Sequence, residues 1–246
     1  MNTMSLRFER KYLVQNNMLE DIRKRLSTFL IPDSMAIVTG TISEYTVRSI
    51  YFDSHNYNSY YEKVEGIKIR KKLRIRGYNQ YYQGCQVFLE IKRKLGDNIS
   101  KNRVLVPYDT LEELLSTGDI HKFIPENKTP GAYENASRFF FNLKKYSQRP
   151  VNLIVYEREP FHGKFDPGVR VTFDKNIRAS LYPKIFDLFS ENGLSYIWNQ
   201  HFILEIKYFT HFMPQWARSL IEEFKLKQAA LSKYTNGLDV HQLAFQ

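Results

Sequence analysis

The chain has 246 residues and carries 36 Lys and Arg against 26 Asp and Glu, a formal net charge of +10. With 43% hydrophobic residues it can bury a full core, and a balance this basic predicts a polyanionic partner: nucleic acid, a membrane surface or phosphate chains. A single cysteine, Cys85, excludes a disulfide framework and a cluster of thiolate metal ligands. No stretch approaches the ~20 apolar residues of a membrane span and the N-terminus has no apolar signal core, so we expect a soluble, cytoplasmic protein.

The first elements already separate charge from apolar surface. Residues Arg7–Val14 alternate as a strand, with Arg7, Glu9 and Lys11 on one face. A helix follows, capped by Asn16 and running to about Leu30. Residues Tyr45–Asp53 are β-branched and aromatic, which predicts a second long strand, and the polar run to Glu65 predicts a loop with a short helix.

The clearest pattern lies in Gly66–Gly77, GIKIRKKLRIRG. In an extended chain alternate side chains point to opposite faces, so this segment has one nearly apolar face and one face of cations. The cations of that face are Lys68, Arg70, Lys72, Arg74 and Arg76. Successive cations lie roughly 6–7 Å apart, a range at which like charges repel unless water or an anion intervenes.

The next two segments repeat the pattern. Gln86–Lys94 has an apolar face and a mostly ionic face, and a third strand at about Lys101–Pro107 adds Arg103. Pairing of these strands would place cations opposite cations, which destabilises a sheet unless something negative lies between them.

The second half of the chain returns to strands after two helices. The helices are expected after Asp109, which would cap the first, and near Tyr133–Tyr146. Three strands follow at Val151–Glu159, Val169–Lys175 and His201–Tyr208, and Pro214 is placed to open a last helix through about Lys227. No repeat, low-complexity run or clear linker interrupts the chain, so we expect one domain over residues 1–246.

About eight strands with helices between them predict an α+β fold built on a closed eight-stranded antiparallel β-barrel, with helices packed outside. In a barrel each strand alternates between lumen and exterior, so the ionic faces would line the lumen. A lumen of Lys and Arg is unstable when dry and empty, which predicts a water-filled tunnel that binds an anion.

Eight short motifs, in order, resemble those of the VTC domain, the catalytic polyphosphate polymerase domain of the vacuolar transporter chaperone complex. This family lies within the triphosphate tunnel metalloenzyme, or CYTH-like, superfamily. Each motif is weak alone, but together they run from residue 7 to residue 234, the expected tunnel core. They are ERKY at Glu9–Tyr12, VRSIYFD at Val47–Asp53, KLRIR at Lys72–Arg76, FLEIKRK at Phe88–Lys94, YERE at Tyr156–Glu159, RVTFD at Arg170–Asp174, LEIKY at Leu204–Tyr208 and LSKY at Leu231–Tyr234.

The resemblance implies an enzyme that transfers the terminal phosphoryl group of ATP to a growing inorganic polyphosphate chain, with Mn²⁺ or Mg²⁺ as cofactor. It implies a metal ligand in Glu205 and tail residues Ser232 and Lys233 that complete the tunnel. Lys94 is expected at the tunnel mouth, where it would contact product. Glu205, Arg74, Arg76 and Lys11 would act at the reacting phosphates. The phosphate-binding set implied by position is Lys11, Arg74, Arg76, Lys92, Arg103, Tyr156, Arg158 and Arg170.

The residue types suit this chemistry, because phosphoryl transfer depends mainly on in-line positioning and on cations that stabilise phosphate oxygens. With one carboxylate as metal ligand, the substrate must supply most of the others. Related tunnel hydrolases open with E-x-E-x-K, whereas this chain has Arg7 at the first acidic position, a change that favours holding a long polyanion over hydrolysis. Any membrane protein that carried product away would come from other chains.

Two other functions are compatible with the expected tunnel. A tunnel-type triphosphatase would use the same metal and cations, and a non-catalytic polyphosphate- or nucleotide-binding module would need the cations but not Glu205. Nucleic-acid binding on an open basic sheet is the weakest alternative, because Tyr12 and Phe173 lie opposite the ionic sets of their strands and could not stack bases beside the cations.

Overall fold

The computed structural model describes residues 8–39, 42–96, 98–124, 131–209 and 212–241. Its residues divide into two compact units. Unit 1 consists of Met1–Thr46, Tyr156–Ile177 and Tyr196–Ser232, and unit 2 of Val47–Val155, Arg178–Ser195 and Lys233–Gln246. Strands β4, β8 and β9 are long and contribute residues to both units.

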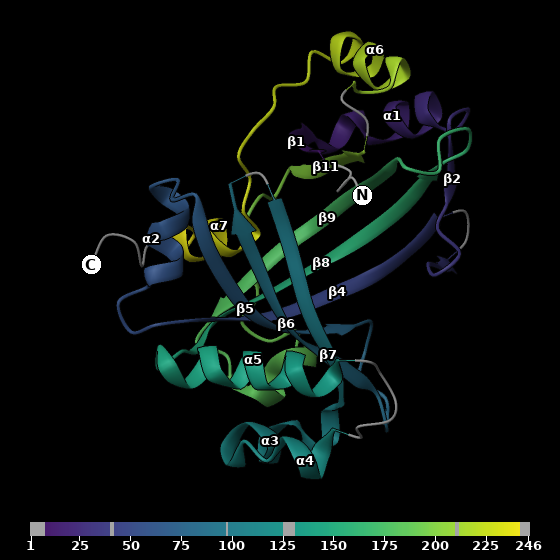
Figure 1. Ribbon diagram of the computed structural model, residues 1–246. Helices are drawn as coiled ribbons and strands as arrows, with labels where there is room; N and C mark the ends of the chain where they lie inside the picture. Colours follow the sequence, from purple (N-terminus) through teal and green to yellow (C-terminus); the bar gives the residue numbers. More distant parts are fainter. Residues whose placement is uncertain (1–7, 40–41, 97, 125–130, 210–211, 242–246) are drawn as a thin grey trace, which may run out of the picture. The chain divides into compact units, whose positions relative to one another are not determined.

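Strands contain more of the described residues than helices do (Figure 1). They are β1 Phe8–Gln15, β2 Leu30–Pro32, β3 Ile37–Thr39, β4 Ile42–Asp53, β5 Ile69–Tyr78, β6 Gln86–Leu95, β7 Asn98–Pro107, β8 Arg149–Gly163, β9 Arg170–Leu181, β10 Ser195–Tyr196 and β11 His201–Tyr208. The α-helices are α1 Leu19–Leu26, α2 Asn58–Val64, α3 Leu111–Thr117, α4 Ile120–Phe123, α5 Ala132–Lys145, α6 Gln215–Glu223 and α7 Lys233–Asp239. Short 3-10 helices lie at Asn16–Met18, Tyr108–Thr110 and Ile185–Phe189.

The α+β class is confirmed, but the closed eight-stranded barrel is wrong. The sheet has eleven strands, with the order β1-β11-β9-β8-β4-β5-β6-β7 and three short strands off this path. The path ends on β1 and β7, and among the described residues nothing pairs these two strands, so the sheet is open. At β1 the physical reason is visible: the backbone N–H of Ala229 donates to the carbonyl of Lys11 at 2.9 Å, and Gln228 forms a bridge with Tyr12. The edge that would close a barrel is already covered by this segment.

In unit 2 the apolar face of the β5–β7 sheet packs on α5. Leu73 and Ile75 of β5 and Leu89 of β6 are almost fully buried against Phe139 and neighbouring residues of α5. Each such side chain stabilises the fold by about 1.5–3 kcal/mol relative to exposure. Because the apolar set faces α5, the cations between these residues face the opposite side of the sheet.

In unit 1 the apolar faces of β1, β9 and β11 pack with α1 and α6. Tyr12, Phe173 and Leu204 come from the strands, Ile22 from α1 and Leu220 from α6, and all are nearly fully buried. The polar side chains of the same three strands therefore gather on the other face. No helix among the described residues is long and apolar enough to cross a membrane.

Candidate functional site

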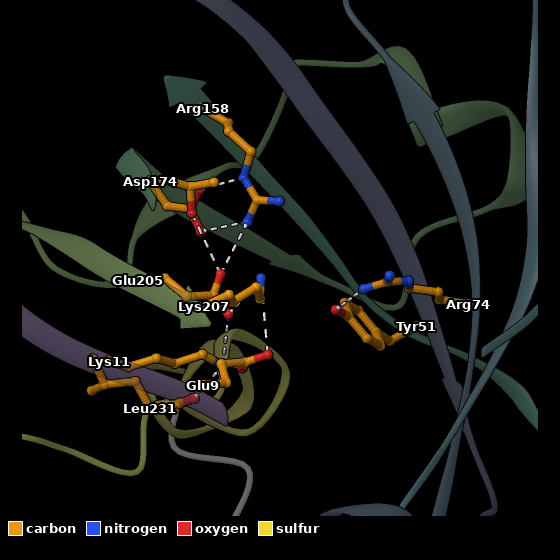
Figure 2. Close-up of polar contacts among 10 residues, drawn as sticks. Glu9, Lys11, Tyr51, Arg74, Arg158, Asp174, Glu205, Lys207 and Leu231 are labelled. Carbon is orange, nitrogen blue, oxygen red and sulfur yellow. Dashed lines mark hydrogen bonds and ion pairs between the residues drawn. The ribbon is translucent and has the colours of Figure 1, made fainter. Parts of the chain in front are cut away.

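Unit 1 holds a cluster of alternating charges on β1 and β11. The strands pair in antiparallel register, with Lys11 opposite Glu205 and Glu9 opposite Lys207. Lys11 Nζ lies 2.9 Å from Glu9 Oε1 and 3.9 Å from Glu205 Oε1, while Lys207 Nζ lies 2.8 Å from Glu205 Oε1 and 3.9 Å from Glu9 Oε2 (Figure 2). Two carboxylates and two ammonium groups thus form one compact network.

Strands β8 and β9 extend this network. Arg158 on β8 binds Asp174 on β9 through two parallel hydrogen bonds of 2.6 and 2.8 Å, and its Nη2 also lies 3.7 Å from Glu205 Oε2. The Thr172 hydroxyl donates to the same Glu205 oxygen at 3.4 Å. The Glu205 carboxylate therefore lies among Lys207, Lys11 and Arg158 while only 4% of the residue is exposed.

The charges of this cluster fix its protonation. Burial alone would raise the pKa of Glu205, but Lys207, Lys11 and Arg158 outweigh burial and hold the pKa well below its ordinary value. For Lys11 burial favours the neutral amine, yet Glu205 and Glu9 raise its pKa above the ordinary range. At neutral pH Glu205 is an anion and Lys11 a cation.

The remaining residues expected in unit 1 are placed as follows. Tyr156 is buried, with the Arg158 guanidinium 5.3 Å from its ring centroid, as expected from their shared strand face. Arg170 lies opposite Lys207, but its guanidinium contacts Asp33 at 3.2 Å, an acid that also contacts His162. Ser232 follows Leu231, whose carbonyl lies 3.5 Å from Lys11 Nζ. Arg7 lies outside the described residues.

In unit 2 the polar face of β5–β7 is dense in cations. The three strands contain ten Lys and Arg residues and a single acid, Glu90. The register aligns cations across the sheet, as the sequence predicted: Lys72 lies opposite Lys92, and Lys92 opposite Lys101. Arg70 likewise lies opposite Lys94.

Glu90 is the one carboxylate that balances this face. Its register neighbours are Arg74 on β5 and Arg103 on β7. Arg74 Nε and Nη2 lie 2.6 and 2.5 Å from Glu90 Oε2, and Lys101 Nζ lies 3.5 Å from Glu90 Oε1. Burial would raise the pKa of Glu90, but Arg74, Arg76 and Lys101 lower it to about 2.

The other predicted residues of unit 2 are placed as follows. Arg76 is 7% exposed and donates to the Ser49 hydroxyl at 3.2 Å. Arg103 is exposed, with its guanidinium 5.0 Å from the ring centroid of Phe88. Lys92 and Lys94 are partly buried, and Lys233 is the first residue of α7.

Three residues of unit 2 belong beside these cations but were not predicted. Tyr51 lies opposite Arg74 and contacts it at 2.9 Å, Tyr234 packs beside Tyr51, and Lys101 pairs with Glu90. Tyr234 stands in the LSKY motif and Lys101 in the third cationic strand, so the spacing used for their neighbours could have found them. Tyr51 stands in the VRSIYFD motif, but a tyrosine adds nothing to the alternation of cationic and apolar residues that marked its neighbours.

The donor chemistry near Glu205 fits a divalent cation only with help from substrate. Among the described residues no three His, Cys, Asp or Glu side chains form a group suited to a metal ion. Two carboxylates, Glu9 and Glu205, nevertheless converge on the Lys207 ammonium, which shows that their oxygens attract a cation. Hard oxygen donors of this kind suit Mg²⁺ or Mn²⁺ when phosphate oxygens and water supply the other ligands.

Comparison with known proteins agrees with the pattern of motifs. The family described as VTC domain matches residues 6–241. A search of curated proteins found no match. Among solved structures, the Mimivirus capping enzyme triphosphatase in a monoclinic form is 10% identical, with 88% of each chain covered and a TM-score of 0.32, a likeness too weak to support any argument. The family match spans nearly the whole sequence, and the chain belongs to the VTC domain family.

Proposed function

We propose that the protein is a metal-dependent polyphosphate polymerase that transfers the terminal phosphoryl group of ATP to a growing inorganic polyphosphate chain. The observation that carries the proposal is the polar face of β5–β7, where eight of the ten Lys and Arg residues of these strands lie with one carboxylate. Aligned like charges destabilise a sheet when nothing negative lies between them, and a phosphate chain supplies one negative charge or more per unit along its length.

In this proposal the cations of unit 2 bind phosphate. Arg74 and Arg76 are nearly buried, and each is held by another side chain, Arg74 by Glu90 and Arg76 by Ser49. Guanidinium groups fixed in this way need little rearrangement when they bind the equatorial oxygens of a transferring phosphoryl group. Lys92, Lys94 and Arg103 are more exposed and suit a chain that must slide as it grows.

In unit 1 the proposal assigns the metal to Glu205. When bound, a divalent cation would neutralise phosphate charge and bring the reacting oxygens into line. Lys11, Arg158 and Lys207 keep the Glu205 carboxylate ionised and fixed, so it can bind a cation at neutral pH. Lys11 and Arg158 can also contact phosphate oxygens directly.

The test is incubation of purified protein with ATP and Mn²⁺ or Mg²⁺, with polyphosphate resolved on a gel. Glu205→Ala and Arg74→Ala are compared with the unmodified protein, and Lys122→Ala, an exposed lysine on α4 paired with Glu113, is the matched control. We expect a ladder of polyphosphate that both site variants lose and the control keeps.

Other outcomes would favour the two alternatives. Free phosphate without chains, lost in Glu205→Ala, would identify a triphosphatase. Tight binding of ATP or polyphosphate without turnover, surviving Glu205→Ala but not Arg74→Ala, would identify a binding module. The enzyme proposal fails if no product forms with either metal.

A further inference from the structure

Tyr51 occupies a fixed position beside the most buried cations of unit 2. It lies on β4 directly opposite Arg74 on β5, and its hydroxyl lies 2.9 Å from Arg74 Nη1 (Figure 2). The opposite side of the same guanidinium is held by Glu90 at 2.6 Å. Because the phenol oxygen accepts this hydrogen bond from Arg74, its own proton remains to be donated.

The groups that face Tyr51 are mainly positive. Arg74, Arg76 and Lys72 all act on it from β5. From α7 the ring of Tyr234 packs at 5.3 Å between centroids, and Lys72 Nζ lies 4.5 Å from that same ring centroid. The charged and titratable side chains that act on Lys72 in turn are Tyr51, Lys63, Lys92 and Arg70.

The buried acid on the same strand is engaged elsewhere. Asp53, two residues along β4, accepts hydrogen bonds from the backbone N–H groups of Ser59 at 2.9 Å and Tyr60 at 3.0 Å, and from the hydroxyl of Tyr234. Glu90 is bound to Arg74 on the side away from the phenol hydrogen bond. Glu90 offsets part of the Arg74 charge, but Arg76 and Lys72 also act on Tyr51, so its surroundings stay positive.

These neighbours shift the pKa of both Tyr51 and Lys72. Burial would raise the pKa of Tyr51, but Arg74, Arg76 and Lys72 outweigh burial and lower it to about 7. Burial, together with Lys63, Lys92 and Arg70, lowers the pKa of Lys72 to about 7 despite the opposing effect of Tyr51. By contrast, burial raises the pKa of Tyr108, a partly buried tyrosine of the same unit, to about 12.

We propose that Tyr51 is a phosphate-binding residue: its hydroxyl donates a hydrogen bond to a phosphate oxygen held by Arg74, and Tyr51 without its proton no longer binds phosphate there. A phenol can donate to an anion and still accept from Arg74. A phenolate cannot donate, repels phosphate and competes with it for the guanidinium.

One consequence distinguishes a Tyr51 that binds phosphate from a Tyr51 that only positions the Arg74 guanidinium. A bound phosphate adds negative charge beside Tyr51 and therefore favours the phenol, so binding takes up a proton from solvent wherever Tyr51 was ionised. A residue that only supported the guanidinium would produce no such uptake. The inference rests on the proposed phosphate site in unit 2, but it needs neither metal nor turnover.

The experiment uses inorganic tripolyphosphate without metal and the full chain. Near-ultraviolet absorbance of tyrosinate is recorded against pH, with and without tripolyphosphate, for the unmodified protein, Tyr51→Phe and Tyr108→Phe. We expect one tyrosine to ionise near neutral pH, to shift upward by about one pH unit or more with tripolyphosphate, and to disappear in Tyr51→Phe only. Tyr108→Phe should match the unmodified protein at these pH values.

Calorimetry in buffers of different ionisation enthalpy provides the second readout, because it counts protons taken up on binding. Tyr51→Phe should bind tripolyphosphate about tenfold more weakly near pH 6, and the difference in affinity should shrink as pH rises. Near pH 7 it should take up fewer protons on binding than the unmodified protein, because only the share of Lys72 remains.

The outcomes distinguish the inference from the proposed function. If tripolyphosphate binds to the unmodified protein but no tyrosine titration moves, or if proton uptake is as large in Tyr51→Phe as in the unmodified protein, the inference is wrong while the phosphate site stands. If tripolyphosphate does not bind at all, both are wrong. Even if Tyr51→Phe does not fold, the absence of a tyrosine that titrates near neutral pH in the unmodified protein would overturn the inference.

Discussion

The Lys207 ammonium lies 2.8 Å from Glu205 Oε1, in a position where a cation bound to that carboxylate would lie. The same ammonium lies 3.9 Å from Glu9 Oε2. A metal ion at Glu205 must therefore compete with the positive charge of a lysine two residues along the same strand.

This relationship predicts that Lys207→Gln binds Mn²⁺ about tenfold more tightly than the unmodified protein, because removal of one charge at this distance is worth more than 1 kcal/mol in a partly buried site. Calorimetry with Mn²⁺ in the absence of nucleotide measures the affinity. The matched control is Lys175→Gln, whose ammonium is similarly buried but pairs with Glu44 at 2.7 Å and with Glu159. Equal or weaker Mn²⁺ binding by Lys207→Gln would argue against Glu205 as the metal ligand.

Glu90 should make the stability of the fold dependent on acid. Its pKa is about 2 in the folded protein against an ordinary value of 4.5, so its contribution is complete above the ordinary value and is lost as pH falls through the folded value. Glu90→Gln should reduce the free energy of unfolding by about 3 kcal/mol at pH 7 and by about half of that near pH 3.

Urea denaturation of both proteins at each pH measures this difference. Glu113→Gln removes an exposed carboxylate paired with Lys122 and should show no measurable change. A constant gap between Glu90→Gln and the unmodified protein at both pH values would show that Glu90 is not held ionised by its neighbours.

The strands of the cationic face could be predicted from sequence because alternation of charge and apolar residues is a local signal. β5, β6 and β7 begin and end within a few residues of the expected bounds, and their cations align as expected. Two expected helix caps are wrong. Asn16 begins a 3-10 helix without capping α1, and the Asp109 carboxylate instead accepts from the Tyr81 hydroxyl and the Gly84 backbone.

The sequence could not show that the sheet stays open, because this depends on a contact between segments far apart in sequence. The residues at 228–229 reach the free edge of β1 through a backbone hydrogen bond, which carries no side-chain signature. The cross-strand pairs of the site could not be predicted for the same reason. The motifs identified Lys11 and Glu205 separately, but only the register of β1 and β11 shows that they lie opposite each other.

Asp53 should anchor the C-terminal helix of unit 2. Its carboxylate is fully buried and binds both the N-terminal backbone of α2 and the hydroxyl of Tyr234 in α7. Asp53→Asn replaces an acceptor by a donor at one oxygen and should lower the free energy of unfolding by about 2–3 kcal/mol. Tyr234→Phe removes a single hydrogen bond and should cost about 1 kcal/mol.

Hydrogen exchange followed by mass spectrometry locates the effect of these two variants. Faster exchange should be confined to residues of α2 and α7 in Asp53→Asn and to α7 in Tyr234→Phe. Uniformly faster exchange over the described chain, with no excess in these helices, would show that Asp53 does not anchor them.

Gly237 provides a test of how closely α7 packs within unit 2. An added Cβ would lie 2.5 Å from Ile154 Cδ1 and 3.0 Å from Asn152 Nδ2, both on β8. Helix propensity alone predicts that Gly237→Ala stabilises the protein by about 1 kcal/mol, whereas overpacking of this size costs about 1–3 kcal/mol. Because Asn152 is held by a 3.0 Å hydrogen bond to the carbonyl of Tyr234, we expect the clash to prevail and the variant to be destabilised. Gly168→Ala, whose Cβ would meet nothing nearer than 3.5 Å, is the control and should be close to neutral in urea denaturation. A stabilised Gly237→Ala would mean that α7 lies further from β8 than these distances indicate.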